Sequence, residues 1–263
     1  MTRKTTAGSG VLGFLFAGLC ACLWSVAAGA GESTAPDGIS PEIWAKIGPQ
    51  IERQAYDFDD EMKARNPAQD FALAAECDGM NVDGALRFRA VALNGTELPQ
   101  AAPVVQAQRV EYRRGSVTEW FENRQDGLEQ GFTLEKPESG NLKPEKVELD
   151  IAVETEMTLE LAADGQAILF RRGASQFKYD GLKAWDAAGR KLASAFEVAA
   201  AEKRIRIVCD ARGAQFPITI DPILTSMEKK LTASDKAASD NFGYSVSVAG
   251  DVALVGAYNA DPD

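Results

Sequence analysis

The stretch ALRFRAVALNG, residues 85–95, decides the fold class. Apolar residues alternate with others from Ala85 to Leu93, which is the period-two pattern of a β-strand with one face toward a core. Asn94-Gly95 follows at once, and this dipeptide favours a two-residue hairpin turn because both residues tolerate a positive φ. We therefore expect a strand that reverses at Asn94 and pairs with an antiparallel neighbour.

The same combination of short runs and glycine turns recurs from Phe71 to Leu224. The further turn dipeptides are Asp78-Gly79, Asp126-Gly127, Asp164-Gly165, Asp180-Gly181, Ala188-Gly189 and Arg212-Gly213. About a dozen short strands between such turns predict a mainly β fold, an antiparallel sandwich or a barrel, and we expect the sandwich. Roughly 150 residues suffice to bury a core.

A short helix is expected before this region. Ser40-Pro41-Glu42 has the residue types of an N-cap, a first-turn proline and a first-turn acid. The apolar residues at helical spacing are Ile43, Trp44, Ile47 and Ile51. Gly48-Pro49 should break this run into a short helix and a second one that reaches toward Met62. We expect Trp44 and the isoleucines to pack onto the domain that follows.

The N-terminus has the three parts of a secretory signal. Arg3 and Lys4 form a basic region, Val11 to Val26 is apolar, and Ala28-Gly29-Ala30 is an A-x-A site. We expect cleavage after Ala30 and no stable membrane span afterwards. The alternatives are an uncleaved anchor or buried helix, and a lipoprotein whose first residue would be Cys22.

The expected mature chain is acidic. Without Arg3 and Lys4 it has 26 basic residues against 39 acidic ones, a net charge of −13. This charge repels nucleic acid and phospholipid headgroups, so neither is expected as a partner. It can favour divalent cations or basic partners, although scattered acidic residues are more typical of a solvated surface.

Cysteine and histidine usage limits the chemistry. Cys77 and Cys209 remain after removal of the signal. They could form one disulfide, or each could be a separate small core residue. The chain has no histidine. Ser-His-Asp and Cys-His systems, His general bases and H-E-x-x-H zinc sites are therefore excluded.

No acidic pair has the spacing of a catalytic site. Glu119 and Glu122 stand three apart on a predicted strand, so they should face opposite sides of the sheet. The acidic residues from Asp57 to Glu61 are expected to form a solvated face. Gly243 to Ser247 lacks the second glycine and the helix of a nucleophile elbow. We expect no catalytic, cofactor-binding or metal-binding residues.

Aromatic residues leave one alternative open. Trp120, Phe121 and Phe132 could line a sugar-binding face, but strand aromatics more often fill the core, which is the interpretation that we favour.

The composition changes after Asp221-Pro222, and we expect a domain boundary near Thr225. Small and hydroxyl residues lead to one predicted hairpin, formed by Phe242 to Val248 and Val252 to Ala257 around Ala249-Gly250-Asp251.

This hairpin resembles an FG-GAP repeat, the unit of integrin-α-like β-propellers. The matching residues are Phe242-Gly243, Ser245-Val246 and Leu254-Val255-Gly256-Ala257. The preceding region looks like the β-rich domain that stands before the propeller in bacterial secreted FG-GAP proteins. Its matching segments are Asn66-Pro67, Val110–Gly115, Thr118–Trp120, Gly127–Leu134, Tyr179–Asp186 and Pro217–Pro222. The resemblance implies part of a propeller blade after the sandwich.

Two departures limit what the resemblance implies. Many FG-GAP repeats bind Ca²⁺ in an acidic loop, but Ala249-Gly250-Asp251 offers one carboxylate, so calcium binding is not carried over. Asn259, Asp261 and Asp263 lie in the next loop and do not form a complete ligand set. A propeller needs about four to eight blades, and this sequence has half of one, so we expect a truncated product or a fragment of a longer protein.

The expected organisation is a signal peptide at 1–30, a linker and helix at 31–65, a β-sandwich at 66–224 and a partial FG-GAP repeat at 225–263. The expected function is that of a secreted or cell-surface, non-enzymatic adhesion or scaffold protein, with an extracellular protein or a glycan as its partner. The alternative is a secreted glycan-binding or glycan-active module.

Overall fold

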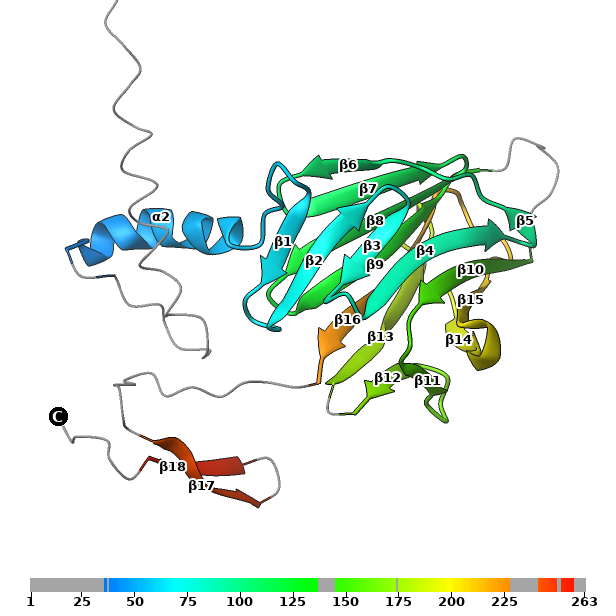
Figure 1. Ribbon diagram of the computed structural model, residues 1–263. Helices are drawn as coiled ribbons and strands as arrows, with labels where there is room; N and C mark the ends of the chain where they lie inside the picture. Colours follow the sequence, from blue (N-terminus) through cyan, green and yellow to red (C-terminus); the bar gives the residue numbers. More distant parts are fainter. Residues whose placement is uncertain are drawn as a thin grey trace, which may run out of the picture. The chain divides into compact units, whose positions relative to one another are not determined.

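The computed structural model describes residues 36, 38–136, 145–173, 175–227, 241–249 and 252–257 (Figure 1). The chain divides into two units, one of residues 35–230 and one that combines residues 1–34 with 231–263. The expected signal peptide, residues 1–30, lies outside the described residues.

The helix differs from the expected one. A single helix, α2 (Pro41–Gln54), runs through Gly48-Pro49, so the predicted break is wrong, and so is the second helix toward Met62. Ser40 caps the helix because its Oγ accepts a hydrogen bond from the Ile43 amide at 3.3 Å. The φ of proline suits a helix, and Pro49 still contributes its carbonyl, which accepts from Arg53 Nε at 3.1 Å.

Trp44 explains the glycine in this helix. A Cβ at Gly48 would lie 2.9 Å from Trp44 Cε2, so only glycine leaves room for the buried indole. Neither Trp44 nor the helix isoleucines belong to the buried cluster of the sandwich, and Ile43 is exposed. The predicted packing of this face onto the following domain is therefore wrong.

Two antiparallel sheets make up the rest of the larger unit (Figure 1). Sheet A has the order β1-β2-β3-β4-β10-β15-β14, and β5 pairs with β4. Its strands are β1 (Lys63–Asn66), β2 (Phe71–Glu76), β3 (Gly79–Val82), β4 (Leu86–Leu93), β5 (Thr96–Glu97), β10 (Lys146–Glu154), β14 (Ser194–Ala199) and β15 (Arg204–Asp210). A short 3-10 helix, η2 (Ala200–Glu202), connects β14 to β15.

Sheet B has the order β11-β12-β13-β16-β9-β8-β7-β6. Its strands are β6 (Pro103–Gln106), β7 (Arg109–Arg114), β8 (Val117–Arg124), β9 (Gly127–Leu134), β11 (Thr158–Leu161), β12 (Ile168–Arg172), β13 (Ser175–Trp185) and β16 (Ile218–Ser226). Both sheets have open edges, so the expected sandwich is confirmed.

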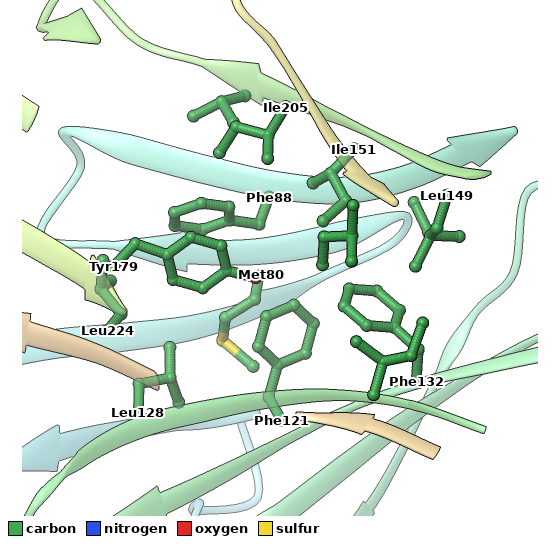
Figure 2. Packing of buried hydrophobic residues seen from close by; sticks show 14 of the residues in the cluster. Met80, Phe88, Phe121, Leu128, Phe132, Leu149, Ile151, Tyr179, Ile205 and Leu224 are labelled. Atoms are coloured by element: carbon green, nitrogen blue, oxygen red, sulfur yellow. The ribbon is translucent and has the colours of Figure 1, made fainter. Parts of the chain in front are cut away.

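The core lies between the inner faces of the two sheets. Figure 2 shows Met80 of sheet A beside Phe121 and Leu128 of sheet B, and Phe88 of sheet A beside Tyr179 of sheet B, with ring centres 5.6 Å apart. Alternation along the strands is the cause: in β15, every second residue is buried.

The hairpin that the sequence predicted at Asn94-Gly95 is present. Leu93 pairs with Thr96, and Asn94 and Gly95 both have positive φ values, 51° and 76°. The tight turn therefore follows from the local sequence.

Val91 forms a β-bulge in β4. On the neighbouring strand β10, Asp150 pairs with Ala92 and Ile151 with Ala90, which leaves Val91 without a partner. Ala90 and Val91 are both buried, and the Ala90 amide donates to the side chain of Glu119 in the other sheet.

Pro222 interrupts the hydrogen-bond ladders of a central strand. On the β9 side of β16, pairing skips from Ile220 to Ile223, and on the β13 side it shifts between Asp180 and Lys183. A proline has no amide to donate, so it is tolerated inside a sheet where the ladder is irregular.

The second unit contributes one described hairpin, β17 (Phe242–Ala249) paired with β18 (Val252–Ala257). Its large apolar side chains are exposed: Tyr244 by 74%, Val246 by 62% and Leu254 by 73%.

Candidate functional site

Glu119 and Glu122 face opposite sides of sheet B, as predicted. Glu119 is fully buried between the sheets, whereas Glu122 is partly exposed on the outer face. The two carboxylates cannot act on one substrate bond.

Glu119 forms the centre of a buried polar network that the sequence analysis missed. Its two carboxylate oxygens both accept a hydrogen bond from the Ala90 amide, each at 3.1 Å. This bond satisfies a buried amide next to the β4 bulge. Gln130 Nε2 donates to Oε1 at 2.9 Å, and the Tyr179 hydroxyl donates to Gln130 Oε1 at 2.8 Å. Burial raises the pKa of Glu119, although these donors and Arg114 oppose the shift.

Arg114 extends this network to sheet A. Its Nε donates to Glu119 Oε2 at 2.9 Å, and its Nη1 forms an ion pair with Asp78. Asp78 also forms an ion pair with Arg89, at 3.3 Å. Arg114 is fully buried, and its guanidinium lies 5.2 Å from the centre of the Tyr112 ring. Two carboxylates facing two guanidiniums balance the charge, so the network links the sheets, although Arg114 Nη2 is buried without a hydrogen-bond partner.

Aromatic residues fill both sides of β8. Phe121 and Phe132 belong to the core, which confirms the favoured interpretation for both. Trp120 lies on the outer face but is only 7% exposed, because it lies over Gly131 and the Arg109 guanidinium covers it at 4.1 Å from the ring centre. No free ring face remains at Trp120 for a sugar to stack on.

A second pair of carboxyl groups, missed by the sequence analysis, lies on this outer face. Glu129 of β9 and Asp221 of β16 share a hydrogen bond, and we call them the Glu129–Asp221 pair. Burial is the main cause that raises the pKa of Asp221 to about 7, followed by the hydrogen bond and the negative charge of Glu129. Arg124 Nη1 lies 2.9 Å from Glu129 Oε2, and Lys183 is the strand neighbour of Asp221.

Two glycines explain why this pair is desolvated. Gly127 and Gly131 stand two residues before and after Glu129 on the same face of β9. Trp120 lies in the space above Gly131, and Ile223 lies within 2.8 Å of a Cβ added at Gly127. The two glycines that flank Glu129 were the sequence signal that could have pointed to a covered carboxylate. No local pattern in the sequence connects Glu129 with Asp221.

The two cysteines are free. Cys77 is exposed in the turn between β2 and β3, and Cys209 is buried in β15. The disulfide alternative is therefore wrong, and Cys209 is the small core residue of the other alternative. Burial is the main cause that raises the pKa of Cys209 to about 11.

The acidic residues after helix α2 shape a turn. Asp59 Oδ1 accepts from the amides of Glu61 and Lys63, both at 2.9 Å. Within the described ranges, no group of three His, Cys, Asp or Glu residues could hold a metal ion. Gly250-Asp251, Asn259, Asp261 and Asp263 lie outside those ranges.

A shallow hollow of about 270 Å³ lies between the end of β15 and the segment before β14. Its charged lining residues are Arg190, Lys191, Asp210 and Arg212. Asp210 pairs with Arg212 at 2.5 Å, and Arg190 lies 3.3 Å from Asp186. These ion pairs neutralise two of the three cations, so the hollow has little charge to attract a ligand.

A protein-family model matches the C-terminal part of the chain, from the end of β16 onward. The family model of the FG-GAP repeat matches residues 225–263, which include the β17–β18 hairpin. Residues 225–263 carry an FG-GAP repeat. No curated protein matches the chain.

One solved structure with a weak likeness is a family GH92 α-mannosidase from Bacteroides thetaiotaomicron in complex with mannoimidazole. It is 8% identical with a TM-score of 0.35, and the match covers 66% of this chain and 31% of that one. This chain thus spans about a third of the length of that enzyme. Separately, none of the described helices is long and apolar enough to cross a membrane.

Proposed function

We propose that this chain is a non-enzymatic, exported protein in which a β-sandwich precedes part of an FG-GAP propeller, and that it acts in adhesion or as a scaffold. The observation that carries the proposal is the FG-GAP match over residues 225–263. FG-GAP repeats typically occur in extracellular or surface proteins, and the secretory pattern of residues 1–30 supports the same location.

The hairpin supports the propeller part of the proposal. An isolated two-stranded sheet is only marginally stable in water, and Tyr244, Val246 and Leu254 expose most of their apolar surface. Neighbouring strands of the same kind would cover these residues, as the blades of a propeller do. These exposed residues support the proposal that the chain is part of a longer FG-GAP protein, of the bacterial secreted kind that its sequence resembles.

The polar residues support the non-enzymatic part. The Glu119 carboxylate accepts hydrogen bonds from Ala90 and Arg114 inside the core, and Glu122 lies on the opposite face of the sheet. Glu129 and Asp221 bond to each other, so they do not flank a space that a glycosidic bond could occupy. Because Trp120 is covered by Arg109, no described feature favours the glycan-binding alternative over a protein partner.

The test uses the secreted chain, purified after export. We expect its N-terminus to be Gly31, by intact mass, and we expect no release of sugar from a panel of polysaccharides. Immobilised chain should retain cells or purified extracellular proteins, and Val246→Lys should weaken this retention if the hairpin contributes. Hydrolysis of any polysaccharide would contradict the proposal, and binding on a glycan array without protein binding would favour the alternative.

A further inference from the structure

The β9–β16 contact contains a feature that the proposed function does not use. We propose that Asp221 is a proton-operated latch, which holds β16 against β9 while its carboxyl group donates a hydrogen bond to Glu129 and loosens this contact when that group is ionised.

The main chain is weak at this point. Between the pairs Ile220–Phe132 and Ile223–Glu129 the β9–β16 ladder is interrupted, and Pro222 has no amide to contribute. The ladder with β13 shifts register beside the same residues. Asp221 immediately precedes Pro222 and keeps its pairing with Lys183 of β13, so its side chain bridges β16 to β9 where the β9 ladder alone skips two residues of β16.

The surroundings favour a protonated Asp221. Trp120 and Ile223 lie above the two glycines that flank Glu129, and the Glu129 side chain is only 14% exposed. Removing water from two adjacent carboxylates makes their simultaneous ionisation costly, because neither solvation nor distance weakens the repulsion.

The charged groups around the pair come from three strands. Arg124 of β8 pairs with Glu129, and Glu122 of β8 is the direct strand neighbour of Glu129. Arg109 of β7 is engaged by Glu122 and also by Glu111, while Lys183 of β13 stands opposite Asp221. Arg124 also pairs with Asp126. Once Asp221 ionises, these five carboxylates outnumber the three cations Arg109, Arg124 and Lys183.

The direction of the pH effect follows from linkage. The pKa of Asp221 is about 7 in the folded protein and 3.8 ordinarily, so the folded state holds the proton more tightly than the unfolded state does. The stabilisation is complete below about pH 4 and is lost as the pH rises through about 7. Because residue 225, where the FG-GAP match begins, lies within β16, the latch acts on the strand from which the repeat continues.

Hydrogen exchange of the full chain, read by mass spectrometry at about pH 5.5 and about pH 8.5 with intrinsic rates corrected, tests the latch. Protection of β16 and β9 should fall at least about tenfold at the higher pH, while that of β15 in sheet A stays constant. Asp221→Asn keeps a donor for Glu129 but cannot ionise, so it should remove the change. Glu160→Gln, an exposed carboxylate on β11, should leave the change intact.

Two results would overturn the latch: β16 protection that follows β15 at both pH values, or an Asp221→Asn protein that retains the wild-type change. A second measurement covers the case in which the variant fails to fold. Carbon-13 NMR of the wild-type side-chain carboxyl groups should show one that titrates within about one unit of pH 7, and the absence of such a group would equally reject the latch.

Discussion

Glu119 Oε2 accepts a 2.9 Å hydrogen bond from Arg114 Nε, and both side chains are fully buried between the sheets. Removal of one partner leaves an uncompensated charge in the core. We expect Arg114→Met to lower the free energy of unfolding by about 3–5 kcal/mol in urea denaturation.

The double variant Arg114→Met, Glu119→Leu should lose much less than the sum of the single variants, because it leaves no lone charge. Glu122→Gln, on the outer face of the same strand, is the control and should change stability by about 0.5 kcal/mol or less. Additive single losses would show that the two residues do not act as a pair.

Gly131 is predicted to be irreplaceable while Trp120 is present. A Cβ at this position would overlap the six-membered ring of Trp120, so Gly131→Ala should cost about 1–3 kcal/mol through forced displacement of the indole. Thr133→Ala, two residues along the same face of β9, is the control with a small expected effect. In a Trp120→Ala background the Gly131→Ala penalty should largely vanish, and an undiminished penalty would assign it to the backbone instead.

The two cysteines should react very differently with a thiol reagent. Cys77 is exposed and should be labelled at once in the native protein, whereas Cys209 is buried, and its pKa of about 11 leaves little thiolate at neutral pH. We expect one fast thiol under native conditions and two in urea without a reductant, counted by mass. No labelling of either thiol in urea would indicate a disulfide and would contradict the structure.

The exposed hairpin residues should contribute little to the stability of the sandwich. Val246 is 62% exposed in the second unit, so Val246→Ser should change the urea midpoint of the sandwich hardly at all. Phe121→Ala, in the buried cluster, should cost about 3–5 kcal/mol by comparison. A large loss with Val246→Ser would mean that the sandwich depends on the hairpin for its stability.

Local signals predicted most of the strands and failed at the helix. Asn94-Gly95 encodes its own turn, because both residues accept the positive φ that the hairpin needs. Gly48-Pro49 suggested a break for the same local reason. That prediction was wrong because Gly48 accommodates the indole of Trp44, a contact within the helix that glycine propensity does not reveal.

The sequence by itself determined the mainly β class, the positions of the turns and the FG-GAP hairpin, because alternation and turn chemistry depend on neighbouring residues. Only the tertiary structure decided that Glu119 is buried with Arg114, and that Asp221 lies beside Glu129, where burial raises its pKa. Pairing of distant strands brings these groups together, and the water that the fold removes decides their charge. A carboxylate in the sequence therefore does not reveal whether it will be solvated, paired or protonated.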